Sequence, residues 1–223
     1  EILLNELDTY LCDIKEAQIR HGLHVLGSLP PRDKRAGTLV AILRLPRGES
    51  PAQRGLLHNL AADLGLPPGF DPLAAGAEPW QGPRPPALAA LADAPWRSAA
   101  DTRERLELLA HRLVETHVLE EGCLATLARD YPATAEQCRH ARERLWADMQ
   151  RGAEMELQSL LDGLEGRFVP PGPSGAPSRG RLDVLPTGRN FFGVDNRAIP
   201  SPAAWSLGEA SAQAFVERYL QDH

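Results

Sequence analysis

Arginine is the residue of this chain that most directly suggests chemistry, and five arginines fall within residues 166–202. This segment has no lysine, no glutamate and two aspartates, so its net charge is +3 in a chain whose net charge is −6. A guanidinium group binds a carboxylate through two parallel hydrogen bonds, whereas a lysine ammonium acts as a point charge. The segment is therefore predicted to contact a ligand that carries several carboxylates. The arginines are Arg167, Arg179, Arg181, Arg189 and Arg197.

The composition of this segment fits either a solvated linker or an ordered loop. Seven prolines and six glycines in 37 positions oppose regular helix and favour disorder. A solvated linker has no reason to expose many apolar side chains, so these favour a loop that packs on a surface. The apolar residues are Phe168, Val169, Leu182, Val184, Leu185, Phe191, Phe192, Val194 and Ile199.

Within the segment, the sequence LPTG at 185–188 predicts a turn. Gly188 accepts backbone angles that other residues avoid, and the turn would project Arg189 and Asn190 outward. These two side chains either contact a ligand or hydrogen-bond carbonyl groups of the loop, and the residues alone leave both interpretations open.

Two histidines, His21 and His24, have a spacing that puts both side chains on one helix face and could bind a metal ion. Gly22 lies between them, and no cysteine or carboxylate is clearly placed to complete a site. A hydrogen-bonded structural histidine is the stronger interpretation, and no metal site is predicted. The chain also lacks the G-x-x-x-x-G-K-[ST] loop that cradles nucleotide phosphates, so it is not expected to hydrolyse ATP.

The elements that position these residues are predicted to be helices. Apolar residues at helical spacing predict helices over 3–20, 36–45, 51–64, 98–117 and 138–164, and a last helix begins near Pro202. Ser98 and Asp101 have the spacing of a capping box. The fold class is therefore mainly α: a helical domain with a long Pro/Gly/Arg-rich ordered loop near its C-terminal end and little or no sheet.

The predicted helices divide the chain into four segments. They are an N-terminal helical segment (1–65), a Pro-rich loop or linker (66–97), a long-helix segment (98–165), and the arginine-rich loop with a C-terminal helix (166–223). The chain starts at Glu1 and stops at His223 within a helical pattern, so all four are expected to belong to one larger polypeptide.

The bulk properties exclude several partners. A net charge of −6 opposes a nucleic-acid surface, which needs a basic field. No run approaches the roughly 18 apolar residues of a membrane span. Three cysteines without a C-x-x-C pair fit a reducing compartment. We therefore expect a cytoplasmic protein that binds neither nucleic acid nor membrane.

Several blocks, in this order, resemble the family of CobN and the magnesium-chelatase H subunit. They are YLCDIKEAQIR (10–20), GLHVLG (22–27), DTRERLELLA (101–110), GRFVPPGPSG (166–175) and DVLPTGRNFF (183–192). The GLH and LPTG blocks resemble both branches of the family. The PPGPSGAP block, together with Arg189, where the magnesium branch tends to have lysine, resembles the cobalt branch.

The resemblance implies a fragment of the tetrapyrrole-binding large subunit of cobaltochelatase. This ligase-class enzyme inserts Co²⁺ into hydrogenobyrinate a,c-diamide during aerobic cobalamin (vitamin B12) biosynthesis, and separate AAA+ ATPase subunits use ATP with Mg²⁺. The fragment alone would be inactive and hold no cofactor. Two alternatives are a docking domain for the AAA+ subunits without ligand contact, and a magnesium chelatase H subunit that inserts Mg²⁺ into protoporphyrin IX.

The family segment that we would nominate for metal insertion, an HG followed by LEWxPGK, does not occur in this chain and would lie upstream of Glu1. The catalytic residues are therefore unknown. The resemblance and the arginine pattern together imply that this part of the subunit frames the macrocycle. The candidate substrate-binding residues are His24, Arg167, Arg179, Arg181, Arg189 and Asn190.

Overall fold

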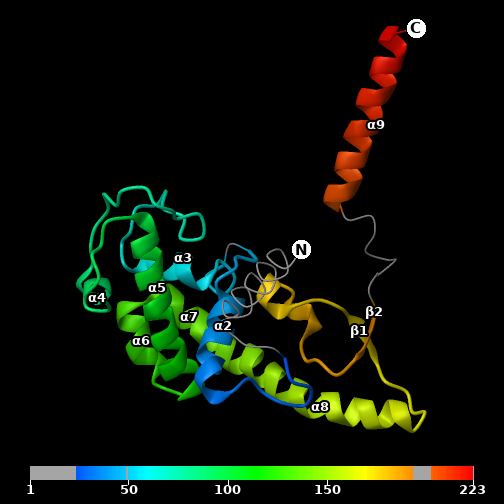
Figure 1. The fold of residues 1–223 in the computed structure, drawn as a ribbon, viewed down its shortest axis with the longest axis horizontal. Coiled ribbons are helices and arrows are strands. Elements are labelled where there is room, and N and C mark those ends of the chain that lie inside the picture. Colours follow the sequence, from blue (N-terminus) through cyan, green and yellow to red (C-terminus); the bar gives the residue numbers. More distant parts are fainter. Residues whose placement is uncertain (1–23, 49, 193–201, 223) are drawn as a thin grey trace, which may run out of the picture.

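The computed structural model describes residues 24–48, 50–192 and 202–222 (Figure 1). Its helices are α2 (Arg35–Leu43), α3 (Leu56–Asp63), α4 (Pro86–Ala89), α5 (Ala99–Val114), α6 (Leu124–Asp130), α7 (Pro132–His140), α8 (Ala147–Leu164) and α9 (Pro202–Asp222). Two strands, β1 (Pro171–Pro173) and β2 (Asn190–Phe192), form the only sheet in this described part of the chain. The mainly α prediction, with little sheet, is confirmed.

The core lies between α2, α3, α5 and α7, which pack against one another. Fully buried leucines line the facing sides of three of these helices, and burying each contributes about 1.5–3 kcal/mol. A polar contact crosses the same core: the Asn59 side-chain amide donates to Gln137 Oε1 at 2.6 Å, and Gln137 Nε2 donates to the Leu43 carbonyl at 3.1 Å. The fully buried leucines of these helices are Leu39, Leu43, Leu56, Leu57, Leu60 and Leu106.

The capping box predicted for α5 is confirmed. The Asp101 N–H donates to Ser98 Oγ at 3.2 Å, and the Ser98 N–H donates back to the Asp101 carboxylate at 2.8 Å. The Arg97 N–H donates to the same carboxylate, and these hydrogen bonds, led by that from Arg97, lower the pKa of Asp101. After Val114 the chain continues through a turn of π-helix over Glu115–Leu119, so the predicted helical stretch to 117 is present.

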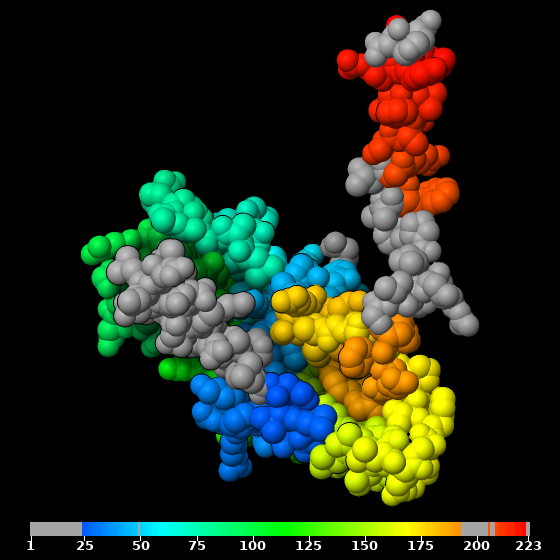
Figure 2. Space-filling model, turned by 45° about the vertical axis from the view of Figure 1, so that its right-hand side comes forward, coloured from blue at the N-terminus to red at the C-terminus, as the bar shows by residue number. Residues whose placement is uncertain are grey.

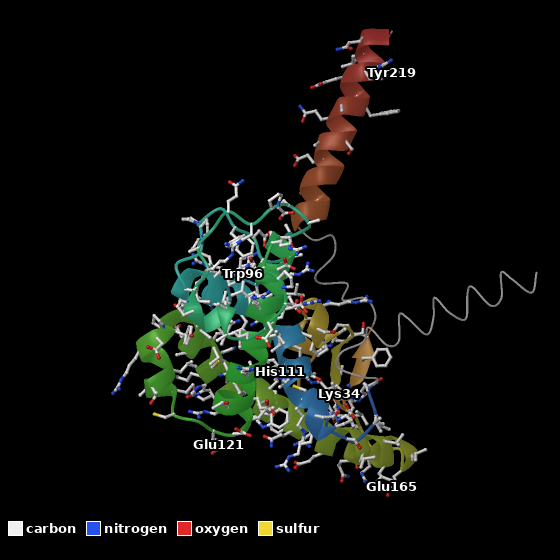
Figure 3. All side chains as sticks on the ribbon, turned by 60° about the vertical axis from the view of Figure 1, so that its left-hand side comes forward. Lys34, Trp96, His111, Glu121, Glu165 and Tyr219 are labelled. Atoms are coloured by element: carbon white, nitrogen blue, oxygen red, sulfur yellow. The ribbon has the colours of Figure 1, made fainter. Side chains whose placement is uncertain are left out.

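Parts of the Pro-rich chain before α5 pack against the beginning of that helix, where the N–H groups of Ala99 and Ala100 donate to the Glu78 and Gly76 carbonyls. Arg105 of α5 is only 3% exposed, and its guanidinium donates to the Ala94 carbonyl at 2.6 Å. The same guanidinium lies over the ring of Trp96, 4.8 Å from its centroid. Figure 3 labels Trp96. A buried arginine thus holds the end of the loop through carbonyl and cation–π contacts.

The apolar residues at helical spacing from Cys138 to Leu164 lie on one continuous helical stretch, as predicted. It consists of α7, a π-helical segment (Ala141–Trp146) and α8. The apolar residues are buried up to Leu145, and Gly152 is also buried. Beyond that point α8 leaves the core, since Leu157, Leu160, Leu161 and Leu164 are between 48% and 77% exposed.

Other helix boundaries differ from the sequence expectations. The helix expected from Pro51 begins at Leu56, because Ser50 to Gln53 form a turn and Gly55 has a φ of 101°, which a helix excludes. The short helices α4 and α6 were not predicted. The helix expected over 3–20, and His21 with it, lie outside the described residues.

Candidate substrate-binding site

The LPTG turn lies directly on the backbone of α8. Gly188 has a φ of 82°, in the left-handed region, as predicted for this turn. A Cβ at Gly188 would lie 2.6 Å from the Met155 carbonyl carbon and 2.7 Å from the Glu156 nitrogen. Gly188 is therefore required for two reasons, its backbone angle and its contact with the helix.

A glycine of α8 makes the matching contact from the helix side. A Cβ at Gly152 would lie 2.5 Å from Thr187 Oγ1 and 3.0 Å from the Thr187 nitrogen. A glycine inside a helix costs about 0.5–1 kcal/mol relative to alanine. The close approach of Thr187 gives a physical reason for a glycine at this position.

The strands β1 and β2 hold the turn from its other side. They pair in parallel, with Pro171 opposite Asn190 and Gly172 opposite Phe191. The Arg189 side chain crosses Gly172, where a Cβ would lie 2.4 Å from Arg189 Cδ. Arg189 Nη2 donates to the Leu185 carbonyl at 3.0 Å, so the loop-carbonyl alternative is observed for this residue. Asn190 is exposed at the start of β2.

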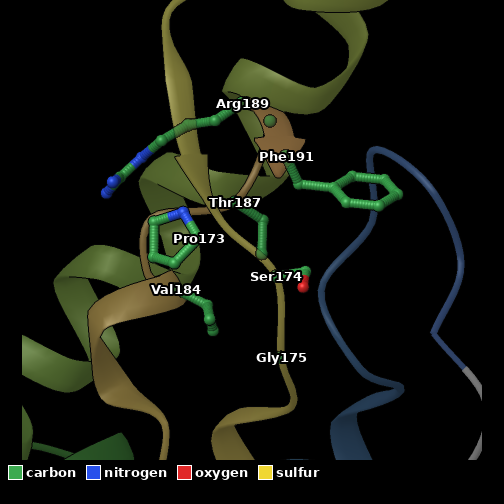
Figure 4. A pocket seen from close by; sticks show the side chains of 8 residues that line it. Pro173, Ser174, Gly175, Val184, Thr187, Arg189 and Phe191 are labelled. Carbon is green, nitrogen blue, oxygen red and sulfur yellow. The ribbon is translucent and has the colours of Figure 1, made fainter. Parts of the chain in front are cut away.

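A small cavity of about 260 Å³ opens beside the turn. Figure 4 shows Arg189 and Phe191 pointing to opposite sides of it, with Thr187 between them. Sites for drug-sized ligands are about 300–1,000 Å³, so this cavity is sized for a substituent of a large ligand rather than for a whole macrocycle. It is lined by Pro173, Ser174, Gly175, Val184, Thr187, Gly188, Arg189 and Phe191.

The other candidate arginines do not gather at the cavity. Arg167 forms ion pairs with Asp162 and Glu165 near the C-terminal end of α8, where Figure 3 labels Glu165. Hydrogen bonds, led by that from Arg167, lower the pKa of Asp162. Arg181 binds Asp183 at 2.8 Å and lowers the pKa of that carboxyl group. Both arginines are thus neutralised locally.

The arginine-rich segment contains two more arginines, of which Arg179 is a candidate binding residue. Arg179 is exposed at the end of a short 3-10 helix (Pro177–Arg179), and no hydrogen bond or ion pair of its side chain is found within the described ranges. Arg197, which the sequence analysis counted with the other arginines, lies outside those ranges. The predicted cluster of arginines is therefore not assembled by the described residues, and Arg189 is the arginine that borders the cavity.

His24 contacts a carboxylate that the sequence analysis did not identify. Its Nε2 lies 2.9 Å from Oε1 and 3.0 Å from Oε2 of Glu156 on α8. The Gly27 N–H donates to the same carboxylate at 2.7 Å. The Glu156 side chain is 5% exposed and the His24 side chain 62% exposed, so a buried carboxylate holds a histidine that faces solvent. The interpretation of His24 as a hydrogen-bonded histidine agrees with this geometry.

His24 and Gly27 of the GLHVLG block and the LPTG turn therefore contact the same part of α8. Gly27, with a φ of 70°, packs so closely on Leu157 that a Cβ there would lie 2.4 Å from Leu157 Cγ. The contacts of both blocks fall between Gly152 and Leu157, which covers about 8 Å of helix axis. Figure 2 shows the blue segment after residue 24 lying against the yellow-green surface of α8.

Two further properties of the described residues bear on function. They contain no group of three or more histidine, cysteine, aspartate or glutamate side chains that could hold a metal ion. None of the helices in this part of the chain is both long enough and apolar enough to cross a membrane.

Comparison with known proteins assigns this arrangement to a family. The chain belongs to the CobN/Magnesium Chelatase family, whose model matches residues 1–223. It is 53% identical to the aerobic cobaltochelatase subunit CobN of Pseudomonas aeruginosa and 45% identical to that of Sinorhizobium sp, in each case over 99% of this chain. The chain spans only 17% and 18% of the lengths of these relatives.

Matches to the magnesium branch are shorter. The magnesium-chelatase subunit ChlH of Oryza sativa subsp. indica is 46% identical over 71 residues, which covers 32% of this chain and 5% of that protein. Among solved structures, the catalytic subunit of cobaltochelatase from Mycobacterium tuberculosis matches 91% of this chain with a TM-score of 0.57 and 29% identity, over 15% of its own length.

Proposed function

We propose that this chain is part of the large, tetrapyrrole-binding subunit of an aerobic cobaltochelatase. The complete cytoplasmic enzyme inserts Co²⁺ into hydrogenobyrinate a,c-diamide, and AAA+ ATPase subunits supply the energy of ATP hydrolysis. The observation that carries the proposal is the extent of similarity: the two CobN relatives match 99% of the chain, whereas the rice magnesium-chelatase relative matches 32%.

Within that enzyme, the LPTG turn and its cavity bind one peripheral arm of the macrocycle. Arg189 borders the cavity, and only one of its five N–H groups has a hydrogen-bond partner among the described residues. A guanidinium in this position suits the carboxylate of an acetate or propionate arm. The cavity volume of about 260 Å³ fits such an arm and excludes the ring itself.

The metal preference is tested with the full-length subunit and its partner ATPases. We expect insertion of Co²⁺ into the corrin precursor in the presence of ATP and no insertion of Mg²⁺ into protoporphyrin IX. The reverse preference would assign the protein to the magnesium branch and refute the proposal. Binding of the ATPases with no affinity for either macrocycle would instead support a docking domain.

The role of Arg189 is tested by tetrapyrrole binding, measured as quenching of tryptophan fluorescence. Arg189→Ala in the full-length subunit is expected to raise the dissociation constant about 10-fold or more, since a charge-assisted hydrogen bond contributes about 1.5–3 kcal/mol. Arg181→Ala is the matched control, because Arg181 lies in the same loop but pairs with Asp183. Equal affinities for Arg189→Ala and wild type would exclude the contact.

A further inference from the structure

Glu156 is a buried carboxylate whose presence packing alone does not explain. Its side chain is 5% exposed, and within the described residues no lysine or arginine forms an ion pair with it. Burial of a carboxylate costs several kcal/mol unless the charge is compensated. A neutral glutamine would accept the Gly27 hydrogen bond equally well. The negative charge of Glu156 is therefore explained by its contact with His24.

When Glu156 is ionised, the geometry of the pair assigns different roles to the two ring nitrogens. An ionised carboxylate only accepts hydrogen bonds, so Nε2 of His24 carries the proton that faces Glu156. In the neutral ring Nδ1 then holds a free lone pair, and no hydrogen bond to Nδ1 is found among residues 24–48, 50–192 and 202–222. A proton taken up at Nδ1 would leave the Nε2–H in place, directed at the Glu156 carboxylate 2.9 Å away.

The position of the pair connects it to the cavity. Glu156 belongs to the stretch of α8 on which the LPTG turn rests, and its backbone nitrogen would lie 2.7 Å from a Cβ at Gly188. Gly188 also lines the cavity. The exposed His24 ring is thus anchored on the same helical turn as the proposed binding site for a macrocycle arm.

We propose that His24 is a proton acceptor for metal insertion and that Glu156 is its positioning residue; this inference rests on the proposed function. Insertion of a divalent metal into a free-base tetrapyrrole releases two N–H protons. For each proton, the pyrrole N–H bond breaks, its electron pair stays on the nitrogen, and an Nδ1–H bond forms on His24. The exposed ring then passes the proton to water before it accepts the next.

The test uses the full-length subunit with its ATPases, in the cobalt-insertion assay described above. His24→Ala is expected to lower kcat about 100-fold or more, as for removal of a general base, with macrocycle affinity unchanged. Glu156→Gln keeps the acceptor for the Gly27 N–H but removes the charge, and is expected to lower kcat about 10-fold or more, less than the loss for His24→Ala. His111→Ala is the matched control, because His111 also lies near a carboxylate, 3.9 Å from Glu115, and is expected to retain full activity.

Rescue by an external base separates proton transfer from a structural role. Imidazole, added with free cobalt held constant by a metal buffer, is expected to restore part of the rate of His24→Ala and none of the rate of the Arg189→Ala variant. A kcat for His24→Ala within about threefold of wild type would overturn the inference while leaving the proposed function intact. So would a rise in the KM for cobalt at unchanged kcat, which would indicate a metal ligand instead. A wild-type enzyme that inserts no cobalt would refute the proposed function itself.

Discussion

Replacing Gly188 by alanine is expected to detach the LPTG turn from α8. An L-residue in the left-handed region costs about 1–2 kcal/mol, and the φ of Gly188 is 82°. The new Cβ would also lie 2.6–2.7 Å from backbone atoms of Met155 and Glu156, and relieving such overpacking costs about 1–3 kcal/mol. The substitution should therefore destabilise the docked conformation of the turn by about 2–5 kcal/mol in total.

Hydrogen exchange in the full-length protein measures this loss at a defined amide. The Asn190 N–H donates to the Pro170 carbonyl at 3.0 Å and so reports on the docked loop. A loss of 2 kcal/mol or more should accelerate its exchange about 30-fold or more. The matched control is Gly180→Ala, because Gly180 has a φ of 86° but no atom within 4 Å of its Cβ position. Equal acceleration of Asn190 exchange in the two variants would refute the assigned contact with α8.

Three further predictions concern the helical body. Gly152→Ala should lower the midpoint of thermal unfolding, because the clash of the new Cβ with Thr187 outweighs a gain in helix propensity of about 0.5–1 kcal/mol. Gly163→Ala should not lower it, because a Cβ there makes only an ordinary contact at 3.9 Å. Equal midpoints for the two variants would contradict the contact between Gly152 and Thr187. Mass spectrometry after alkylation near neutral pH should find Cys123 modified and Cys138 protected. Burial raises the pKa of the Cys138 thiol to about 12, whereas hydrogen bonds, led by that with the Thr126 side chain, lower the pKa of the exposed Cys123 thiol. Modification of Cys138 in the native protein would contradict this prediction. The pKa of Asp101 is lowered from its ordinary value of 3.8, so the capping contribution should be complete above that value and disappear as the pH falls through the lower folded-state pKa. The stability difference between wild type and Asp101→Asn, followed by unfolding against pH, should shrink below pH 3.8, and a constant difference would contradict it.

The predictable part of the fold consists of helices with both a terminal signal and a long apolar stripe. α5 has a capping box and buried leucines at helical spacing, and its position was predicted correctly. α6 has seven residues and a single buried one, Leu127, so no stripe was available to identify it. Pro51 resembled a helix start, but a local turn follows it, and Gly55 has a positive φ at a place where a Cβ would lie 2.7 Å from the Arg44 carbonyl oxygen.

The candidate site was only partly predictable for a similar reason. The turn at Gly188 is local, and its residue types indicated its backbone angle. The net charge of the segment predicted more arginines at the site than the structure places there. Asp162 and Asp183 lie close in sequence to Arg167 and Arg181 and form ion pairs with them. Glu156 is 132 residues from His24, so no local spacing connects the two, and only the fold brings them together.

The size of the cavity limits what this part of the subunit contributes to the proposed reaction. Because about 260 Å³ accommodates an arm and not a ring, the proposed function places the ring across the surface beside the cavity. Phe191, which lines the cavity, is 72% exposed, and Leu157, which adjoins Glu156, is 50% exposed, so apolar surface is available next to both Arg189 and His24. The chain spans 17% of the length of its Pseudomonas relative, and the proposed function leaves the opposite face of the ring to other parts of the subunit. Under the proposed function, α8 would hold both the arm-binding cavity beside Gly188 and the proposed proton acceptor His24, because the contacts of both fall between Gly152 and Leu157.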